Sequence, residues 1–142
     1  RLSGLAAAFR AAGIADLLVQ RIDRRAAFEA GSIATRALLD GAGAPPDVIC
    51  YLNDHMAFGG LSVCMTRGLA VPEAIGIAGF NDLEINKILP LPITTVLTQR
   101  QLMGATGARN LVARIHGAVV ERSVRIPTRL QEGRTTRGLP RP

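Results

Sequence analysis

The segment Val48-Ile49-Cys50-Tyr51-Leu52-Asn53-Asp54 decides the fold class of this 142-residue chain. Five apolar residues in a row, with no alternating polar residue, are typical of a strand that is covered on both faces. Asn53-Asp54 then opens a helical pattern that closes at Gly68. A second apolar strand, Ile75-Gly76-Ile77-Ala78-Gly79, is likewise followed by a polar turn, Phe80-Asn81-Asp82. The two segments predict neighbouring strands of a parallel sheet.

Helices and strands alternate along the remaining chain. Helical patterns are expected near 5–12, 30–38 and 101–117, and further strands at 17–22, 93–97 and 124–127. Short apolar strands separated by helices predict an α/β fold, a three-layer α-β-α arrangement with helices on both faces of a parallel sheet. The hydrophobic content of 48% fits one compact domain and excludes a disordered chain. No uncharged apolar run approaches the roughly 18 residues of a membrane-spanning helix, so we expect no membrane contact.

The net charge of +6 is concentrated near the C-terminus. Residues 113–142 contain seven arginines and two glutamates, which leaves a net charge of +1 on the rest of the chain. A nucleic-acid-binding domain usually spreads its basic residues over one face, so this distribution argues against general nucleic-acid binding. The composition of 133–142, rich in Pro, Gly, Thr and Arg, predicts a flexible tail.

The sequence contains no recognisable catalytic or phosphate-binding motif. The absence of these motifs predicts no enzyme and no cofactor. The two cysteines and two histidines are not spaced as metal ligands, so we also expect no metal. Cys50 and Cys64 are predicted to be unreactive core residues, which suits a reducing, cytoplasmic location. Gly59-Gly60 lies inside a helical pattern, where close packing explains it better than phosphate binding does.

Polar side chains follow both predicted parallel strands at the point where each strand ends. In open parallel sheets, ligands bind beyond the carboxyl ends of the strands. Asn53-Asp54 and Asn81-Asp82 would meet at this edge, and asparagine amides suit hydroxyl groups because they donate and accept hydrogen bonds. The alternative is structural: Asp54 caps its helix and Asp82 holds a turn.

Four segments together resemble the lac repressor/galactose repressor family of transcription regulators. Residues 46–60 resemble the family's "PDAI…NDxMAxGA", and 67–82 its "RGLxVPxDIxIxGFDD". Residues 92–104 are similar to "PPLTTVxQPxxxMG", and 127–136 to the closing "PxxLxxRxST". The four segments follow in order and cover nearly the whole chain. Phe80 to Glu84 also resembles the gluconate-operon repressors of this family.

The resemblance implies an effector-binding domain like type I periplasmic sugar-binding proteins, mostly its C-terminal subdomain. Residues 1–97 would form that subdomain, 98–122 a helix of the N-terminal subdomain, and 123–132 a returning strand. A helix-turn-helix domain upstream, which this chain does not contain, would read the operator. Effector binding would then shift the orientation of the subdomains and so control DNA binding by a homodimer.

The resemblance also implies effector contacts at Arg1, Asn53 and Asn81, and Phe28 is placed where it could stack on a sugar face. Asp54 and Asp82 adjoin these positions and complete the predicted site. Two departures matter: Asn81 stands where the family usually has Asp, and Thr98 where it commonly has Gln. An Asp would repel a carboxylate, whereas Asn does not, and Arg1 supplies a cation. We therefore hypothesise an anionic effector, a sugar acid such as gluconate, rather than a neutral sugar.

Apolar residues near the ligand-side loops match the family's dimer interface. They are Phe58, Ile85, Ile88 and Leu89. Ordinary core packing is the alternative for these four residues. Two alternatives to the regulator also remain: a periplasmic-type sugar-binding protein of the same architecture, and a nucleotide-dependent enzyme on a doubly wound sheet. The enzyme would need a Gly-rich phosphate turn and a positioned acid or base.

Overall fold

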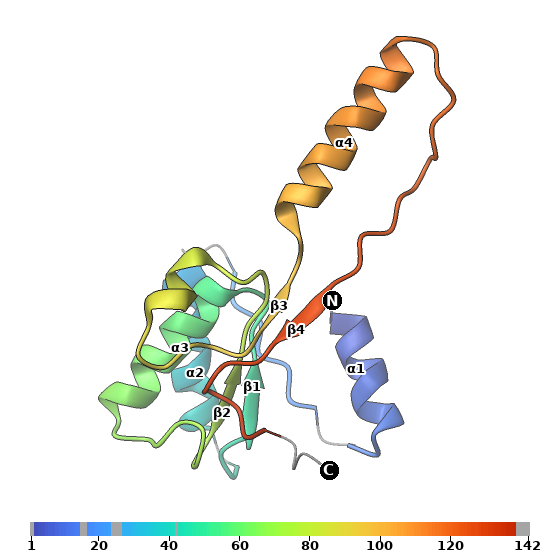
Figure 1. The fold of residues 1–142 in the computed structure, drawn as a ribbon. Helices are drawn as coiled ribbons and strands as arrows, with labels where there is room; N and C mark the ends of the chain where they lie inside the picture. Colours follow the sequence, from blue (N-terminus) through green and yellow to red (C-terminus); the bar gives the residue numbers. More distant parts are fainter. Residues whose placement is uncertain (1, 15–16, 24–26, 42, 139–142) are drawn as a thin grey trace.

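A computed structural model describes residues 2–14, 17–23, 27–41 and 43–138 (Figure 1). These residues form an α/β fold, as the sequence predicts. In chain order the elements are α1 (Leu2–Ala11), α2 (Ala27–Leu39), β1 (Val48–Cys50), α3 (Asp54–Thr66), β2 (Gly76–Ala78), the 3-10 helix η1 (Glu84–Ile88), β3 (Thr95–Leu97), α4 (Arg100–Ile115) and β4 (Arg129–Gln131).

The sheet begins with the two strands that the sequence analysis pairs. β1 and β2 are parallel, with Val48 opposite Gly76 and Cys50 opposite Ala78. A parallel bridge between Ala78 and Thr94 brings the segment before β3 to the other side of β2. β3 then pairs antiparallel with β4. The carboxyl ends of β1 and β2 therefore lie at one edge, next to β3.

Helices α2 and α3 cover one face of the sheet, and their backbones approach closely. A Cβ atom added at Gly31 would lie 2.0 Å from the Met56 carbonyl oxygen, and one at Gly59 would lie 2.1 Å from that of Phe28. The close packing expected of Gly59-Gly60 is thus confirmed. The main core lies beneath these helices and consists of Ile49, Tyr51, Ala57, Leu61, Cys64, Ile75, Ile77 and Ile93.

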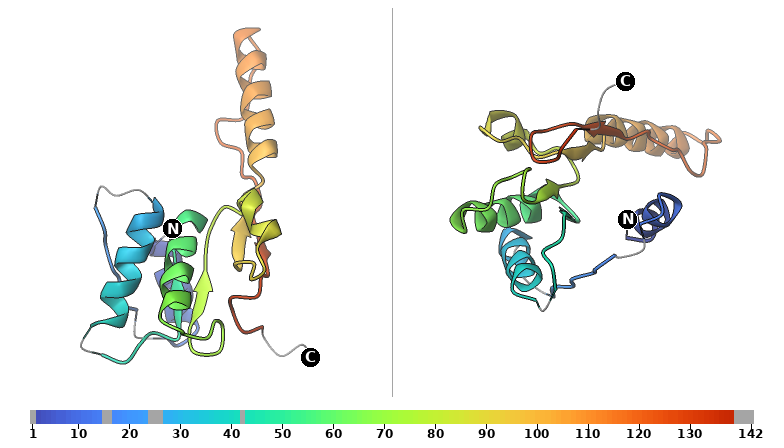
Figure 2. Two further views of the ribbon diagram at one scale, coloured as in Figure 1. Left: turned by 90° about the vertical axis from the view of Figure 1, so that its left-hand side faces the viewer. Right: turned by 90° about the horizontal axis from the view of Figure 1, so that it is seen from below.

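Helix α1 lies on the opposite side of β1 from α2 and α3 (Figures 1 and 2). None of the residues of α1 is buried, so this helix is not packed closely on that face of the sheet. β1 is accordingly covered on one face only: Ile49 is buried, whereas Val48 and Cys50 are exposed. The prediction that Cys50 is a core residue is wrong, while Cys64 is fully buried as predicted.

Two predicted strands differ from the structure. Residues 17–23 contain no strand, and Leu18 and Val19 are exposed, because a strand needs a partner for its backbone groups and none is paired with this segment among the described residues. The last strand lies at 129–131 rather than 124–127. Pro127 has no N–H group to give to a ladder, whereas Arg129–Gln131 are in register with Thr95–Leu97.

Helix α4 projects from the rest of the structure, and residues 116–128 lead back from its tip (Figures 1 and 2). None of its residues is buried, and its apolar side chains Leu111, Val112 and Ile115 are exposed. The base of α4 is tied to the returning chain by a hydrogen bond from Gln99 Nε2 to the Pro127 carbonyl oxygen, 2.6 Å long.

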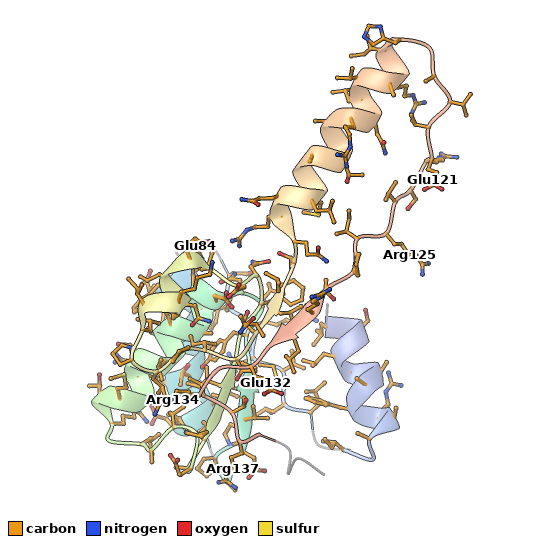
Figure 3. All side chains as sticks on the ribbon, in the orientation of Figure 1. Glu84, Glu121, Arg125, Glu132, Arg134 and Arg137 are labelled. Carbon is orange, nitrogen blue, oxygen red and sulfur yellow. The ribbon has the colours of Figure 1, made fainter. Side chains whose placement is uncertain are left out.

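The expected flexible tail is wrong for its described part, residues 133–138. Thr135 is fully buried, and its hydroxyl donates to the Ile77 carbonyl oxygen (2.6 Å) and accepts from the Thr94 N–H (2.9 Å). The side chains of Arg134 and Arg137 lie against the main part of the fold and donate to the Pro90 and Glu73 carbonyl oxygens (Figure 3). Residues 139–142 lie outside the described residues.

Candidate functional site

Asn53 lies directly after β1 and caps helix α3. Its backbone is extended (φ −155°, ψ 167°), and its side-chain oxygen accepts a hydrogen bond from the Met56 N–H at 3.0 Å. Asn53, and not Asp54, is therefore the cap of this helix. The NH₂ group of the Asn53 amide makes no hydrogen bond to another described residue and is a free donor at the edge of the sheet.

Asp54 is a structural residue and not an exposed ligand contact, which corrects its predicted place among the effector-binding residues. Its side chain is fully buried. One carboxylate oxygen accepts the Leu83 N–H at 2.9 Å, and the other accepts the Thr95 hydroxyl at 2.6 Å. Asp54 thus ties the start of α3 to the loop after β2 and to β3, which places these three segments around one edge.

The loop after β2 carries Asn81 and Asp82, and both have left-handed backbones. Their φ angles are 113° and 50°. Such conformations cost about 1–3 kcal/mol each and persist only where the surroundings impose them. The Asn81 N–H donates to the Val96 carbonyl oxygen at 2.9 Å, so β3 holds the loop from inside. The side chains of Asn81 and Asp82 are partly exposed and make no hydrogen bonds to other described residues.

The register of the sheet brings Asn53 and Asn81 to one edge. Cys50 is paired with Ala78, and each asparagine follows three residues after its member of that pair. A hydrogen bond of 3.1 Å from the Asp54 N–H to the Phe80 carbonyl oxygen continues this alignment beyond the strands. The edge therefore presents the NH₂ group of Asn53, the side-chain amide of Asn81 and the carboxylate of Asp82. We call these three residues the rim.

A cation that the sequence analysis missed also contacts the rim. Arg100, the first residue of α4, donates from Nη1 to the Asn81 carbonyl oxygen (2.7 Å) and from Nη2 to the Asp82 carbonyl oxygen (3.1 Å). Sequence spacing gives no signal for this contact, because 18 and 19 positions separate the partners. Only the path of β3 past the loop brings them together.

The remaining predicted residues are less directly connected to the rim. Phe28 lies in the first turn of α2 and is 50% exposed, so its ring is accessible. Arg1 lies outside the described residues. Among the described residues there is no group of three or more side chains suited to hold a metal ion. The described helices also include none with the length and apolar character needed to cross a membrane.

The predicted dimer residues divide into two pairs. Ile85 and Ile88 lie in η1 and are 52% and 80% exposed. Leu89 is partly buried, and Phe58 packs against the core cluster. Ordinary core packing therefore explains Phe58, whereas η1 presents an apolar pair to solvent beside the rim.

Behind the rim, burial in the core raises the pKa of Tyr51 and of Cys64. Burial raises the pKa of Tyr51 to about 12, although its hydrogen bond with Thr35 acts in the opposite direction. Thr35 donates to the Gly31 carbonyl oxygen at 2.6 Å, so the Tyr51 hydroxyl is the donor in its 2.6 Å contact with Thr35. Burial also raises the pKa of the Cys64 thiol. Both groups stay neutral at physiological pH and belong to the support of the site.

Comparison with known proteins assigns this architecture. Residues 1–136 match the periplasmic binding protein-like domain family. The HTH-type transcriptional regulator GntR of Escherichia coli K12 is 39% identical over 74 residues, which are 52% of this chain and 22% of that protein. The chain thus matches about a fifth of this curated relative's length.

Solved structures extend the similarity to almost the whole chain. The transcription regulator GntR of Chromobacterium violaceum is 33% identical with a TM-score of 0.86, over 96% of this chain and 51% of that one. The lac repressor dimer bound to operator and the anti-inducer ONPF is 25% identical with a TM-score of 0.86, over 96% and 46% of the two chains. The chain therefore belongs to the periplasmic binding protein-like domain family, among the lac repressor/galactose repressor regulators.

Proposed function

We propose that this chain is the effector-binding part of a DNA-binding transcription regulator and that it holds a sugar or sugar acid at the rim. The observation that carries the proposal is the register that aligns Asn53 with Asn81 at the carboxyl ends of β1 and β2. The names of the relatives support a regulator over the alternative of a periplasmic carrier. We propose no enzymatic step, because ligand binding alone performs this role.

The polar groups of the rim suit a polyhydroxylated molecule. The Asn53 amide oxygen already accepts one hydrogen bond, from the Met56 N–H, whereas its NH₂ group makes none to another described residue, so we assign Asn53 the role of a donor to the ligand. Asn81 can both donate and accept, and Asp82 can accept. Asn53 as a donor, Asn81 as both donor and acceptor, and Asp82 as an acceptor suit neighbouring hydroxyl groups of a ligand. Each hydroxyl group can donate one hydrogen bond and accept two.

Charge at the rim favours an anionic sugar. Asn81 adds no negative charge where the family usually has Asp, and the Arg100 guanidinium lies 2.7 Å from the Asn81 carbonyl oxygen. Arg1 would add a second cation to the site. Against these, Asp82 leaves one exposed acidic group in the loop. We propose gluconate as the representative effector, because it combines a carboxylate with a row of hydroxyl groups.

The proposal also gives roles to the exposed apolar side chains of α4 and η1 in a larger protein assembly. The exposed apolar side chains of α4 would pack against a second subdomain, to which residues 98–122 belong, and 123–132 would return from it. Ile85 and Ile88 would contribute to a homodimer interface, together with Leu89. Operator DNA would be read by a helix-turn-helix domain outside this chain, in the cytoplasm.

Calorimetry with gluconate and glucose tests the proposed ligand class. We expect the wild-type chain to bind gluconate more tightly than glucose. Asn81→Asp should weaken gluconate binding about tenfold, since two unit charges about 5 Å apart repel each other by about 1–3 kcal/mol near a protein surface, and should leave glucose binding almost unchanged.

Asn110→Asp is the matched control, because it makes the same charge change within α4, away from the rim. It should alter neither affinity. Tighter binding of glucose than of gluconate, or equal effects of the two substitutions, would contradict the proposal.

A further inference from the structure

We infer that Arg100 is a positioning residue that fixes the Asn81-Asp82 loop and couples it to helix α4. The inference rests on the proposed function only in its reference to a ligand. Its geometry is independent of that function. Arg100 is exposed and belongs to neither the helix cap nor the core.

The backbone of the loop is held from two sides. On the inner side, the N–H groups of Asn81, Asp82 and Leu83 donate to the Val96 carbonyl oxygen (2.9 Å), the Thr95 hydroxyl (3.4 Å) and the Asp54 carboxylate (2.9 Å). On the outer side, the carbonyl groups of Asn81 and Asp82 accept from the two arms of the Arg100 guanidinium. The inner contacts fix the donors and Arg100 fixes the acceptors, so the left-handed pair is constrained as a unit.

Arg100 is also the point where α4 contacts this loop. Gln99, the residue before it, has a left-handed backbone (φ 45°), so the chain turns sharply from β3 into the helix. None of the residues of α4 is buried, and no other residue of the helix forms a hydrogen bond to the loop. Besides the chain connections to β3 and β4, the orientation of α4 relative to the rim therefore depends on the Gln99–Pro127 hydrogen bond and on the Arg100 fork.

This arrangement makes the loop and the helix thermodynamically linked. A ligand that binds the Asn81 amide selects loop conformations that keep the Arg100 fork closed, and a closed fork in turn restrains α4. By reciprocity, the factor by which a ligand stabilises the closed fork is also the factor by which the closed fork strengthens ligand binding, so loss of the fork weakens binding. A planar guanidinium is required, since one lysine ammonium cannot place two donors on two carbonyl oxygens in fixed geometry.

Spin labels on α3 and α4 test the coupling without any ligand. Met65→Cys and Leu111→Cys provide exposed sites, and Cys50→Ser removes the exposed native thiol. In the 142-residue chain we expect Arg100→Lys and Arg100→Gln to broaden the distance distribution between the labels, with an unchanged melting temperature for Arg100→Lys. Arg114→Gln, an exposed substitution near the end of the same helix, is the matched control and should leave the distribution unchanged.

Gluconate calorimetry gives the second readout. Arg100→Lys keeps the charge, so its effect reports the geometry of the fork rather than attraction of an anion. We expect about fivefold weaker gluconate binding in this variant. An Arg100→Lys distribution as narrow as that of Arg114→Gln would overturn the inference even if gluconate binds the wild type. If gluconate fails to bind while the Arg100 variants broaden the distribution, the proposed effector is overturned and the positioning role stands.

Discussion

Asp54→Ala is the sharpest perturbation of the support behind the rim. The substitution removes a fully buried carboxylate that accepts two hydrogen bonds, from the Leu83 N–H at 2.9 Å and the Thr95 hydroxyl at 2.6 Å. Both donors would be left without this acceptor inside the fold. We expect the loop after β2 and strand β3 to loosen together, because Asp54 connects both to the start of α3.

The size of the loss follows from the two contacts. A buried polar group left without its partner costs about 1–3 kcal/mol, so two such donors give about 2–6 kcal/mol. Relief from burying the charge lowers this sum, and we expect a net loss near 3 kcal/mol in the free energy of unfolding. Thr95→Val removes one of the two donors and should cost about 2 kcal/mol. The two sites share a hydrogen bond, so the double variant should lose about 1–2 kcal/mol less than the sum of the two single variants.

Urea denaturation of the four members of this cycle measures these values from the midpoint at constant slope. Asp47→Ala is the control, because Asp47 is an exposed aspartate just before β1 whose side chain forms no hydrogen bond or ion pair with another described residue. It should change the stability by less than about 0.5 kcal/mol. A loss for Asp54→Ala no larger than that of Asp47→Ala, or strict additivity with Thr95→Val, would refute the account of the buried carboxylate.

Four further predictions test the core and the C-terminal segment. Gly60→Ala should lower the free energy of unfolding by about 1–3 kcal/mol, because the added Cβ would lie 1.9 Å from the Tyr51 hydroxyl. Gly104→Ala is the control and should be neutral or stabilising, since nothing lies within 4 Å of its added Cβ. Equal melting temperatures of the two variants would contradict this. Tyr51 is the only tyrosine and there is no tryptophan, so absorbance at 295 nm should show an apparent pKa near 12 in the native chain and near 10 in urea. Since the folded pKa is raised, this stabilisation is complete below pH 10 and is lost as the pH rises toward 12; equal values in both states would be the contrary result. A thiol reagent should modify Cys50 in the folded chain, more slowly than a free thiol because burial raises its pKa, and Cys64 only after unfolding; modification of both in the folded chain would contradict the burial of Cys64. Thr135→Val should cost about 2–3 kcal/mol because the Ile77 carbonyl and the Thr94 N–H both lose a partner, whereas the exposed Thr128→Val should cost almost nothing; similar urea midpoints would contradict this account.

Local sequence signals predicted the elements next to the rim. The apolar runs before Asn53 and Phe80 form β1 and β2 in parallel, and the helix after Asn53 ends where Gly68 was expected to end it. Gly68 has a φ of +68°, a conformation in which glycine is favoured and which terminates a helix. These features depend on a few neighbouring residues, so the sequence carries them directly.

Contacts between distant residues were not predictable in the same way. Composition suggested a free C-terminal tail, but Thr135 forms hydrogen bonds with Thr94 and Ile77, which lie 41 and 58 positions away. The burial of Asp54 likewise depends on Thr95, 41 positions later. A sequence pattern identifies a polar residue at the end of a strand, but only the tertiary fold decides whether it faces a ligand or an internal donor.

The central claim, that the rim holds a polyhydroxylated anion, is tested most directly by NMR titration of the ¹⁵N-labelled chain with gluconate. The account predicts saturable shifts of the Asn53 and Asn81 side-chain amides and of the backbone at 80–83, with none at the tip of α4 around His116. Saturable shifts confined to other parts of the chain, or no shifts in the presence of excess gluconate, would contradict it.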